Sequence, residues 1–129
     1  MSKSLATWFT PSLQTISRSA GRSAVAAAAY RACVKLIDQT TGLIHDYTRK
    51  RGHVETLLVG ADDISELWNK AEAAETRKNS TVARELMLPL PDQWTDNERR
   101  ACVLDITQHL RHTYGVAAAG SIHAANRHD

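Results

Sequence analysis

A tyrosine ends a run of four alanines in the stretch GRSAVAAAAYRA, residues 21–32. In a helix, the alanines leave the next large side chain uncrowded, so Tyr30 is either a core residue or a phenol presented for chemistry. A phenol has an ordinary pKa near ~10, and it attacks another group only with help from a base, a metal ion or positive charge. Positive charge is close in the sequence, at Arg18, Arg22, Arg31 and Lys35. Tyr30 is therefore a candidate nucleophile.

Two residues on expected strands could assist a tyrosine nucleophile. His123 lies late in the chain, and a neutral imidazole can hold a divalent ion that polarises a phosphate. Glu85 lies on another expected strand, where a carboxylate could support catalysis. The alternatives are an ordinary strand histidine and a strand-end charge. Together with Tyr30, the two residues are the parts that DNA strand transfer through a phosphotyrosine link would need.

The positive charge is concentrated in the first part of the chain. Residues 1–54 hold eight Lys and Arg against two Asp and Glu, whereas residues 55–129 hold eight against twelve, for a net charge of +2. The basic stretch TRKRGH contributes Arg49, Lys50 and Arg51. Such a distribution would attract a phosphate-rich partner through counterion release, although an ordinary solvated face and a basic loop would look the same.

Length and composition predict one domain. The chain has 129 residues, 43% of them hydrophobic, which is enough for a modest core. It has no long apolar stretch that resembles a membrane span or a secretory signal, so we expect a cytoplasmic protein without membrane insertion. Cys33 and Cys102 are then expected as reduced core residues rather than a disulfide.

Several common catalytic motifs do not occur in the sequence. It contains no G-x-x-x-x-G-K-[ST], G-x-G-x-x-G, H-E-x-x-H or G-x-S-x-G pattern. P-loop nucleotide hydrolysis and α/β-hydrolase chemistry are therefore unsupported.

The elements that must position these residues begin with a strand over residues 5–17, interrupted near Pro11. Ser23 is a plausible N-cap for a helix that runs to about residue 37. Tyr30, Cys33, Val34 and Ile37 would then share one face, which would point Tyr30 towards the surface on which the helix packs. Residues 38–52 are expected to form a hairpin or an irregular excursion, and residues 53–60 a short strand.

The second half of the chain alternates helices and strands. A helix is expected from Asp62 or Asp63 to about Lys78, with Glu66 placed four residues before Lys70. A strand over 82–90 precedes a helix with a T-x-x-E capping box at Thr95, and a final strand covers 116–126. This order predicts an α+β fold, with helices on one face of a mainly antiparallel sheet.

Four stretches carry a resemblance to a known family. They are RSAGRSAVAAAAYRA, TGLIHDYTRKRG, LWNKAEAAETRKNSTVARELMLPLP and GSIHAAN, in this order and with suitable gaps. The chain thereby resembles, from about residue 17 onward, the N-terminal relaxase domain of the MobA/MobL family, including plasmid TraA proteins. Members nick plasmid DNA at a transfer origin and become attached to its 5′ end. The resemblance implies a relaxase (HUH-like) fold, in which an antiparallel sheet bears histidines opposite a helix that bears the tyrosine.

The resemblance assigns roles by position. Tyr30 matches the nucleophile, His123 the first histidine of a metal triad that holds Mn²⁺ or Mg²⁺, and Glu85 an acidic position that supports catalysis. The segment HDYTRKRG resembles a part of the family near the DNA, so candidate DNA contacts are Tyr47, Arg49, Lys50 and Arg51, in addition to Arg18, Arg22 and Arg31. The implied partners are single-stranded DNA at a transfer origin and relaxosome accessory proteins.

The family carries an H-x-H pair on the strand that follows the first histidine, and this sequence stops at Asp129 before such a pair. We therefore expect residues 1–129 to form one partial relaxase domain, incomplete at its C-terminus. Two functions remain open: a metal-dependent DNA relaxase that nicks through Tyr30, and a remnant that binds single-stranded DNA without cutting it. A structural or interaction protein with neither property is a third alternative.

Overall fold

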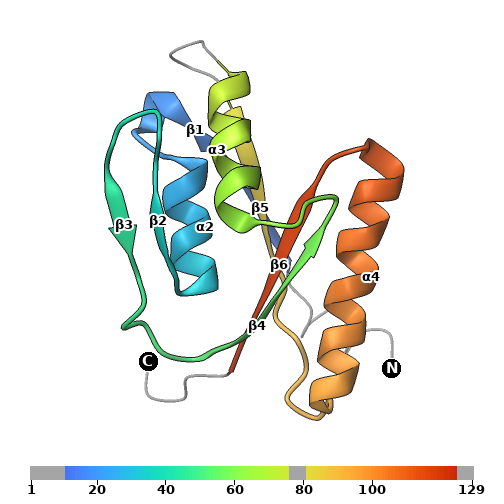
Figure 1. Ribbon diagram of the computed structural model, residues 1–129. Coiled ribbons are helices and arrows are strands. Elements are labelled where there is room, and N and C mark those ends of the chain that lie inside the picture. The colour runs from blue at the N-terminus through green and yellow to red at the C-terminus, as the bar shows by residue number, and fades with distance from the viewer. Residues whose placement is uncertain (1–10, 76–80, 125–129) are drawn as a thin grey trace.

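The strands in the described part of the chain are short and pair in antiparallel fashion. The computed structural model describes residues 11–75 and 81–124 (Figure 1). Its elements, in chain order, are β1 (Ser12–Ser17), a 3₁₀ turn (Arg18–Ala20), α2 (Ala24–Ala32), β2 (Lys35–Ile37), β3 (Ile44–Asp46), β4 (His53–Val59), α3 (Ile64–Ala74), β5 (Thr81–Met87), α4 (Asp96–Tyr114) and β6 (Ala118–His123).

The strands form three antiparallel pairs in the described residues: β1 with β5, β2 with β3, and β4 with β6. Gln14 lies opposite Glu85 in the first pair, and His53 lies opposite His123 in the third. The α+β class and the antiparallel pairing are confirmed. The sequence predicted a mainly antiparallel sheet, and the described strands form it as three two-stranded ladders. Residues 5–10 of the expected first strand lie outside the described residues.

Helix α2 ends earlier than the sequence predicted. Cys33 adopts a left-handed backbone conformation, with φ 55° and ψ 45°, and its N–H bonds to the carbonyl of Ala29. The chain then turns into β2, where Leu36 is buried and its two neighbours are exposed. The predicted helical face of Tyr30, Cys33, Val34 and Ile37 is therefore wrong, because the chain after Cys33 forms a strand in which burial alternates from Lys35 to Ile37.

The caps of the other helices agree with the sequence. The side chain of Asp63 accepts a hydrogen bond from the N–H of Glu66 at the start of α3. Thr95 and Glu98 form the expected capping box of α4, which ends at Gly115 with φ 67°. Helix α3 ends at Ala74, whereas the predicted helix ran to about residue 78; residues 76–80 lie outside the described residues.

Helix α2 is the centre of the packing. Val25, Ala28 and Ala29 form one buried cluster with Leu36 of β2, and Ala24 joins Ile16 and Val82 in a second. Trp68 of α3 contacts both clusters. Because alanine side chains are small, α3 and the strands approach the backbone of α2 closely, and this leaves little freedom in its orientation.

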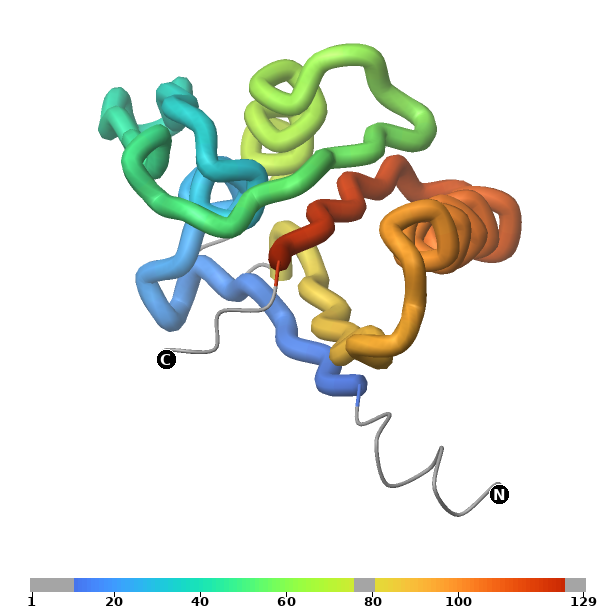
Figure 2. The backbone as a smooth tube through the Cα atoms, turned by 90° about the horizontal axis from the view of Figure 1, so that it is seen from below, coloured from blue at the N-terminus to red at the C-terminus, as the bar shows by residue number. Residues whose placement is uncertain are grey.

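Helix α4 packs on the side of the β4–β6 pair that lies away from α2, as Figure 2 shows. Its close approach requires a glycine: a Cβ atom at Gly120 would lie 2.6 Å from Cγ1 of Val103 and 2.9 Å from Cγ2 of Thr107. No helix within residues 11–75 and 81–124 is both long and apolar enough to cross a bilayer.

Gly120→Ala tests this packing. The added methyl group overlaps two side chains of α4, so we expect unfolding free energy to fall by about 1–3 kcal/mol, measured by urea denaturation. Val103→Ala opens space at the same place, and in the double variant it should recover part of the loss. Stability of Gly120→Ala equal to that of the wild type would show that α4 packs less tightly here.

Candidate active site at the end of helix α2

The phenol of Tyr30 stands at the surface, in the last turn of α2. The residue is 41% exposed, which contradicts the alternative of a core residue. The ring of Tyr47 meets it edge-on, with centroids 5.2 Å apart at 84°. The ammonium group of Lys50 lies 4.2 Å from the Tyr30 ring centroid, and the guanidinium of Arg31 lies 5.3 Å from it. Tyr30 is therefore held by a second ring beside two cations.

A buried carboxylate fixes the other end of α2. Glu72 of α3 is 3% exposed, and its Oε2 accepts the N–H of Ala24, the first residue of α2, at 2.6 Å. Its Oε1 accepts from Nε of Arg18 at 3.2 Å and from Nη2 at 3.0 Å. Arg18 also donates to the backbone carbonyls of Glu72 and Glu75. A negative charge at a helix N-terminus is favourable, so this ion pair anchors α2 to α3.

Glu85 joins both ends of α2 to β5. Its Oε1 lies 3.0 Å from Nη2 of Arg22, which precedes the helix, and its Oε2 lies 3.0 Å from Nε of Arg31 in the last turn. Both carboxylate oxygens therefore have an arginine partner. The catalytic assignment of Glu85 stays a prediction, and the geometry gives this residue a positioning role.

His123 approaches α2 from the end of β6. Its Nε2 lies 2.7 Å from the backbone carbonyl oxygen of Arg31. Burial lowers the pKa of His123 below 6.5, and the positive charge of Lys50 lowers it further. Since a carbonyl only accepts hydrogen bonds, Nε2 carries the proton and Nδ1 keeps a free lone pair.

This arrangement suits one metal ligand. Histidines that bind metals usually donate their other ring N–H to a carbonyl or carboxylate, as His123 does here. In residues 11–75 and 81–124 no three His, Cys, Asp or Glu side chains come together as a group that could hold an ion. His123 is therefore oriented as a metal ligand would be, and the metal assignment stays a prediction.

The predicted basic residues divide into two sets. Arg18, Arg22 and Arg31 are engaged in ion pairs with Glu72 and Glu85.

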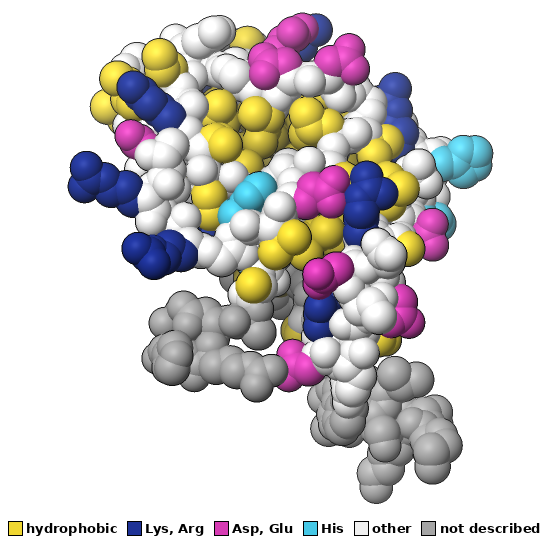
Figure 3. Space-filling view, turned by 60° about the horizontal axis from the view of Figure 1, so that its bottom comes forward, with side chains coloured by type: hydrophobic (Ala, Val, Ile, Leu, Met, Phe, Trp, Pro, Cys, Tyr) yellow, Lys and Arg dark blue, Asp and Glu magenta, His cyan; other side chains and the backbone are white. Residues whose placement is uncertain are grey.

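The second set lies on the connection between β3 and β4. Within the described part of the chain, Arg49, Lys50 and Arg51 have no carboxylate within ion-pair distance. Lys and Arg side chains project along the left edge of the molecule in Figure 3, the side on which β2 and β3 lie. This second set keeps its charge available for a partner, and its assignment as DNA contacts stays a prediction.

Sequence reasoning missed His53. The β4–β6 register places it directly opposite His123, with ring centroids 5.8 Å apart at 79°. Nothing in the spacing of 70 residues signals this pair. Only the pairing of residues 53–59 with 118–123 could have revealed it.

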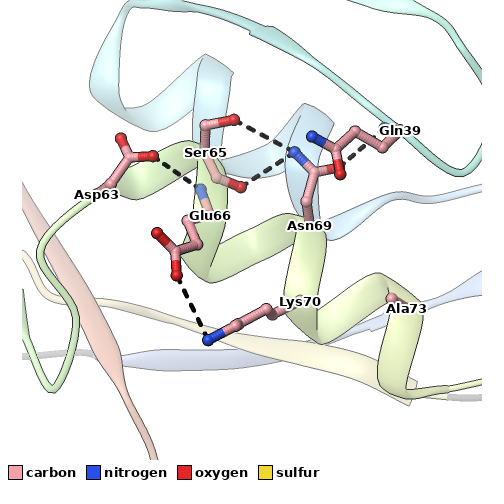
Figure 4. A pocket seen from close by; sticks show the side chains of 7 residues that line it. All are labelled: Gln39, Asp63, Ser65, Glu66, Asn69, Lys70 and Ala73. Carbon is pink, nitrogen blue, oxygen red and sulfur yellow. Dashed lines mark hydrogen bonds and ion pairs between the residues drawn. The ribbon is translucent and has the colours of Figure 1, made fainter.

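A pocket on α3 is not part of this site. It measures about 240 Å³ and is lined by Gln39, by the cap residue Asp63 and by residues of α3, including Asn69 (Figure 4). The Asn69 side chain accepts from the N–H of Gln39 and donates to the carbonyls of Ile37 and Ser65. Glu66 pairs with Lys70, as the sequence predicted. Asn69, Glu66 and Lys70 thus have partners within the protein, and Asn69 stabilises the contact between α3 and the end of β2.

Comparisons of the sequence with known proteins all find proteins of mobilization or conjugal transfer. The sequence model described as MobA/MobL family matches residues 22–129. The chain is 46% identical over 117 residues to "Mobilization protein MobL" of Acidithiobacillus ferridurans, an alignment that covers 88% of this chain and 31% of the relative. It is 34% identical over 116 residues to "Conjugal transfer protein TraA" of Agrobacterium fabrum, which covers 75% of this chain and 10% of the relative. The chain thus spans about a third of the first relative and a tenth of the second.

One solved structure has the same fold. It was described under the words "Molecular Basis of Vancomycin Resistance Transfer in Staphylococcus aureus", and it superposes with a TM-score of 0.74 over 90% of this chain and 69% of that chain. The sequence identity is 24%, so this likeness establishes the fold alone.

Glu72→Gln tests the anchor of α2. Removing the charge leaves Arg18 without its buried partner, so we expect a loss of about 3 kcal/mol in unfolding free energy, measured by denaturant titration. The matched control is Glu66→Gln on the same helix, whose exposed ion pair should contribute less than ~0.5 kcal/mol. Equal effects of the two substitutions would contradict a special role for Glu72.

The His123 environment predicts a pH dependence. Because the folded-state pKa lies below the unfolded value of 6.5, the folded protein binds this proton less readily. The contribution of neutral His123 to stability is therefore present above pH 6.5 and is lost as the pH falls below it. NMR titration of the imidazole should give a midpoint below 6.5. Between about pH 7.5 and about pH 5 the wild type should lose more stability than His123→Gln; parallel pH profiles would refute this assignment.

Proposed function

The chain belongs to the MobA/MobL family, and from this premise we propose that it is the relaxase domain of a plasmid mobilization protein that nicks one DNA strand through Tyr30. The observation that carries the proposal is the exposed phenol of Tyr30 beside two cations, at the end of a rigidly anchored helix. The relatives named for mobilization and conjugal transfer support plasmid DNA as the substrate.

The proposed reaction is a transesterification. The phenolic oxygen of Tyr30 attacks a DNA phosphorus atom, the bond from phosphorus to the 3′ oxygen breaks, and the 3′ oxygen leaves as a hydroxyl after taking a proton. The phenolic proton passes to solvent. The product is a 5′-phosphotyrosyl adduct, which preserves a phosphodiester that a 3′-hydroxyl can later attack in reverse.

Positive charge and orientation are what the site supplies to this reaction. Lys50 and Arg31 lie beside the Tyr30 ring. Lys50 has no ion pair in the described residues and would stabilise negative charge on the phenolate oxygen and on the phosphate, whereas Arg31 would do so less, because Glu85 pairs with it. Tyr47 restricts the ring of Tyr30, and Glu85 holds Arg31 in place. Orientation of this kind lowers the entropic part of the barrier.

A divalent ion, Mn²⁺ or Mg²⁺, is the proposed cofactor, and the Nδ1 atom of His123 would be one of its ligands. When bound, such an ion polarises the phosphate and stabilises its charge. The hydrogen bond from His123 to the backbone carbonyl of Arg31 fixes the imidazole ring of His123. Arg31 directly follows Tyr30 in the chain, so this ring is held against the residue next to the proposed nucleophile.

The proposed DNA surface is the β3–β4 connection, where Arg49, Lys50 and Arg51 are free of ion pairs in the described residues. Single-stranded DNA at a transfer origin fits this charge, with relaxosome proteins as further partners and the cytoplasm as the compartment.

A second candidate function is the binding of single-stranded DNA without cutting. It is favoured by one observation: residues 11–75 and 81–124 contain no group of three or more His, Cys, Asp or Glu side chains that could hold a metal ion.

Covalent adduct formation tests the proposal. The protein is incubated with Mn²⁺ and a labelled pool of random single-stranded oligonucleotides, and the products are separated on a denaturing protein gel. We expect a shifted band that is absent with Tyr30→Phe, because that substitution removes the attacking oxygen. Tyr114→Phe is the matched control, since Tyr114 is 69% exposed on α4 outside the site, and it should retain the band.

A band that persists in Tyr30→Phe would overturn the role of Tyr30. If the wild type gives no band but binds DNA with strong salt dependence, the binding function is the correct one. In that case neutralising Arg49 and Lys50 should flatten the dependence of binding on salt, by roughly 0.7 in log–log slope for each phosphate that the protein no longer neutralises.

A further inference from the structure

Two histidines face each other across the β4–β6 ladder. His53 and His123 are direct partners in the register, and their rings lie 5.8 Å apart at 79°. Two imidazoles that share one ion through nitrogens at ~2.1 Å can have centroids up to about 6.5 Å apart. The observed separation is within that limit.

A β-bulge creates this arrangement. The register shifts between His53 and Glu55, so Val54 has no partner on β6. In a regular strand, His53 and Thr56 would point to opposite faces, since they are three residues apart. The bulge brings them to the same face, and Nε2 of His53 lies 2.7 Å from Oγ1 of Thr56.

The hydrogen bonds leave one ring nitrogen open on each histidine. Oγ1 of Thr56 also lies 2.8 Å from Oγ of Ser121, its partner across the ladder. All three groups are satisfied when Nε2 of His53 donates to Thr56 and Thr56 donates to Ser121, which leaves a lone pair on Nδ1 of His53. Nε2 of His123 is engaged by the Arg31 carbonyl, which likewise leaves Nδ1.

We propose that His53 and His123 form a cross-strand pair that binds one divalent transition-metal ion through their Nδ1 atoms. Thr56 and the Arg31 carbonyl act as the outer groups that orient the two rings, as outer partners do in other metal sites. The proposal that the two histidines bind an ion is argued from geometry. Only the role of that ion beside Tyr30 depends on the proposed function. Because imidazole nitrogens favour Ni²⁺, Cu²⁺ and Zn²⁺ over Mn²⁺, the pair should bind these ions more tightly.

Calorimetric titration of the full chain with Ni²⁺ tests the pair directly. We expect His53→Gln and His123→Gln each to weaken Ni²⁺ binding by roughly tenfold or more. His109→Gln is the matched control, because His109 is exposed on α4 and should not affect the affinity. Thr56→Val removes the hydroxyl that orients His53 but keeps the histidine, so it should weaken binding by about tenfold. It also keeps the test open if His53→Gln fails to fold.

The inference is overturned if the wild type does not bind Ni²⁺, or if His53→Gln and Thr56→Val bind it as the wild type does. Adduct formation separates this result from the proposed function: Tyr30→Phe should keep full Ni²⁺ affinity while it loses the adduct. If the wild type forms the adduct but His53→Gln binds Ni²⁺ as tightly as the wild type, the histidine pair is overturned and the nicking function is unaffected.

Discussion

The buried carboxylate of Glu72 is the interaction on which the site depends. A buried carboxylate is stable only when its oxygens accept hydrogen bonds, and here Arg18 and the N–H of Ala24 donate those bonds. The constraint acts in both directions: α3 satisfies the first N–H group of α2, and the arginine before α2 satisfies the carboxylate of α3. The start of α2 cannot move relative to α3 without exposing one of these groups. The position of Tyr30 at its far end follows from that anchor.

Arg31 has the corresponding role at the other end of the helix. Its side chain pairs with Glu85 of β5 and lies against the Tyr30 ring, while its backbone carbonyl accepts from His123 of β6. One residue thus connects two separate strand pairs to the candidate nucleophile. The fold brings these elements together, although they are far apart in the sequence.

Charge in this protein has two different uses. The arginines nearest Tyr30 in the sequence serve largely to hold the helix, since Glu72 and Glu85 neutralise them. Among the predicted DNA contacts, those without an ion pair in the described residues lie on the β3–β4 connection, which follows the turn at Cys33 and the β2–β3 pair. Lys50 is the clearest case: it is 20 residues from Tyr30, and yet its ammonium group lies 4.2 Å from the ring centroid.

Local patterns in the sequence were sufficient for the helix caps at Ser23 and Thr95, for the end of α4 at Gly115, and for the α+β class, and they narrowed the cap of α3 to Asp62 or Asp63. The order of the sequence motifs was sufficient to predict the MobA/MobL family, because these motifs contain the residues that carry the chemistry as well as those that determine the fold. The end of α2 was not predictable, since apolar spacing at i, i+3 and i+4 does not distinguish a continuing helix from a left-handed turn followed by a strand. Tertiary structure alone decided that Glu85 meets two arginines and that His53 faces His123. These contacts depend on strand register and on one bulge, which are set by packing between segments that are distant in the sequence.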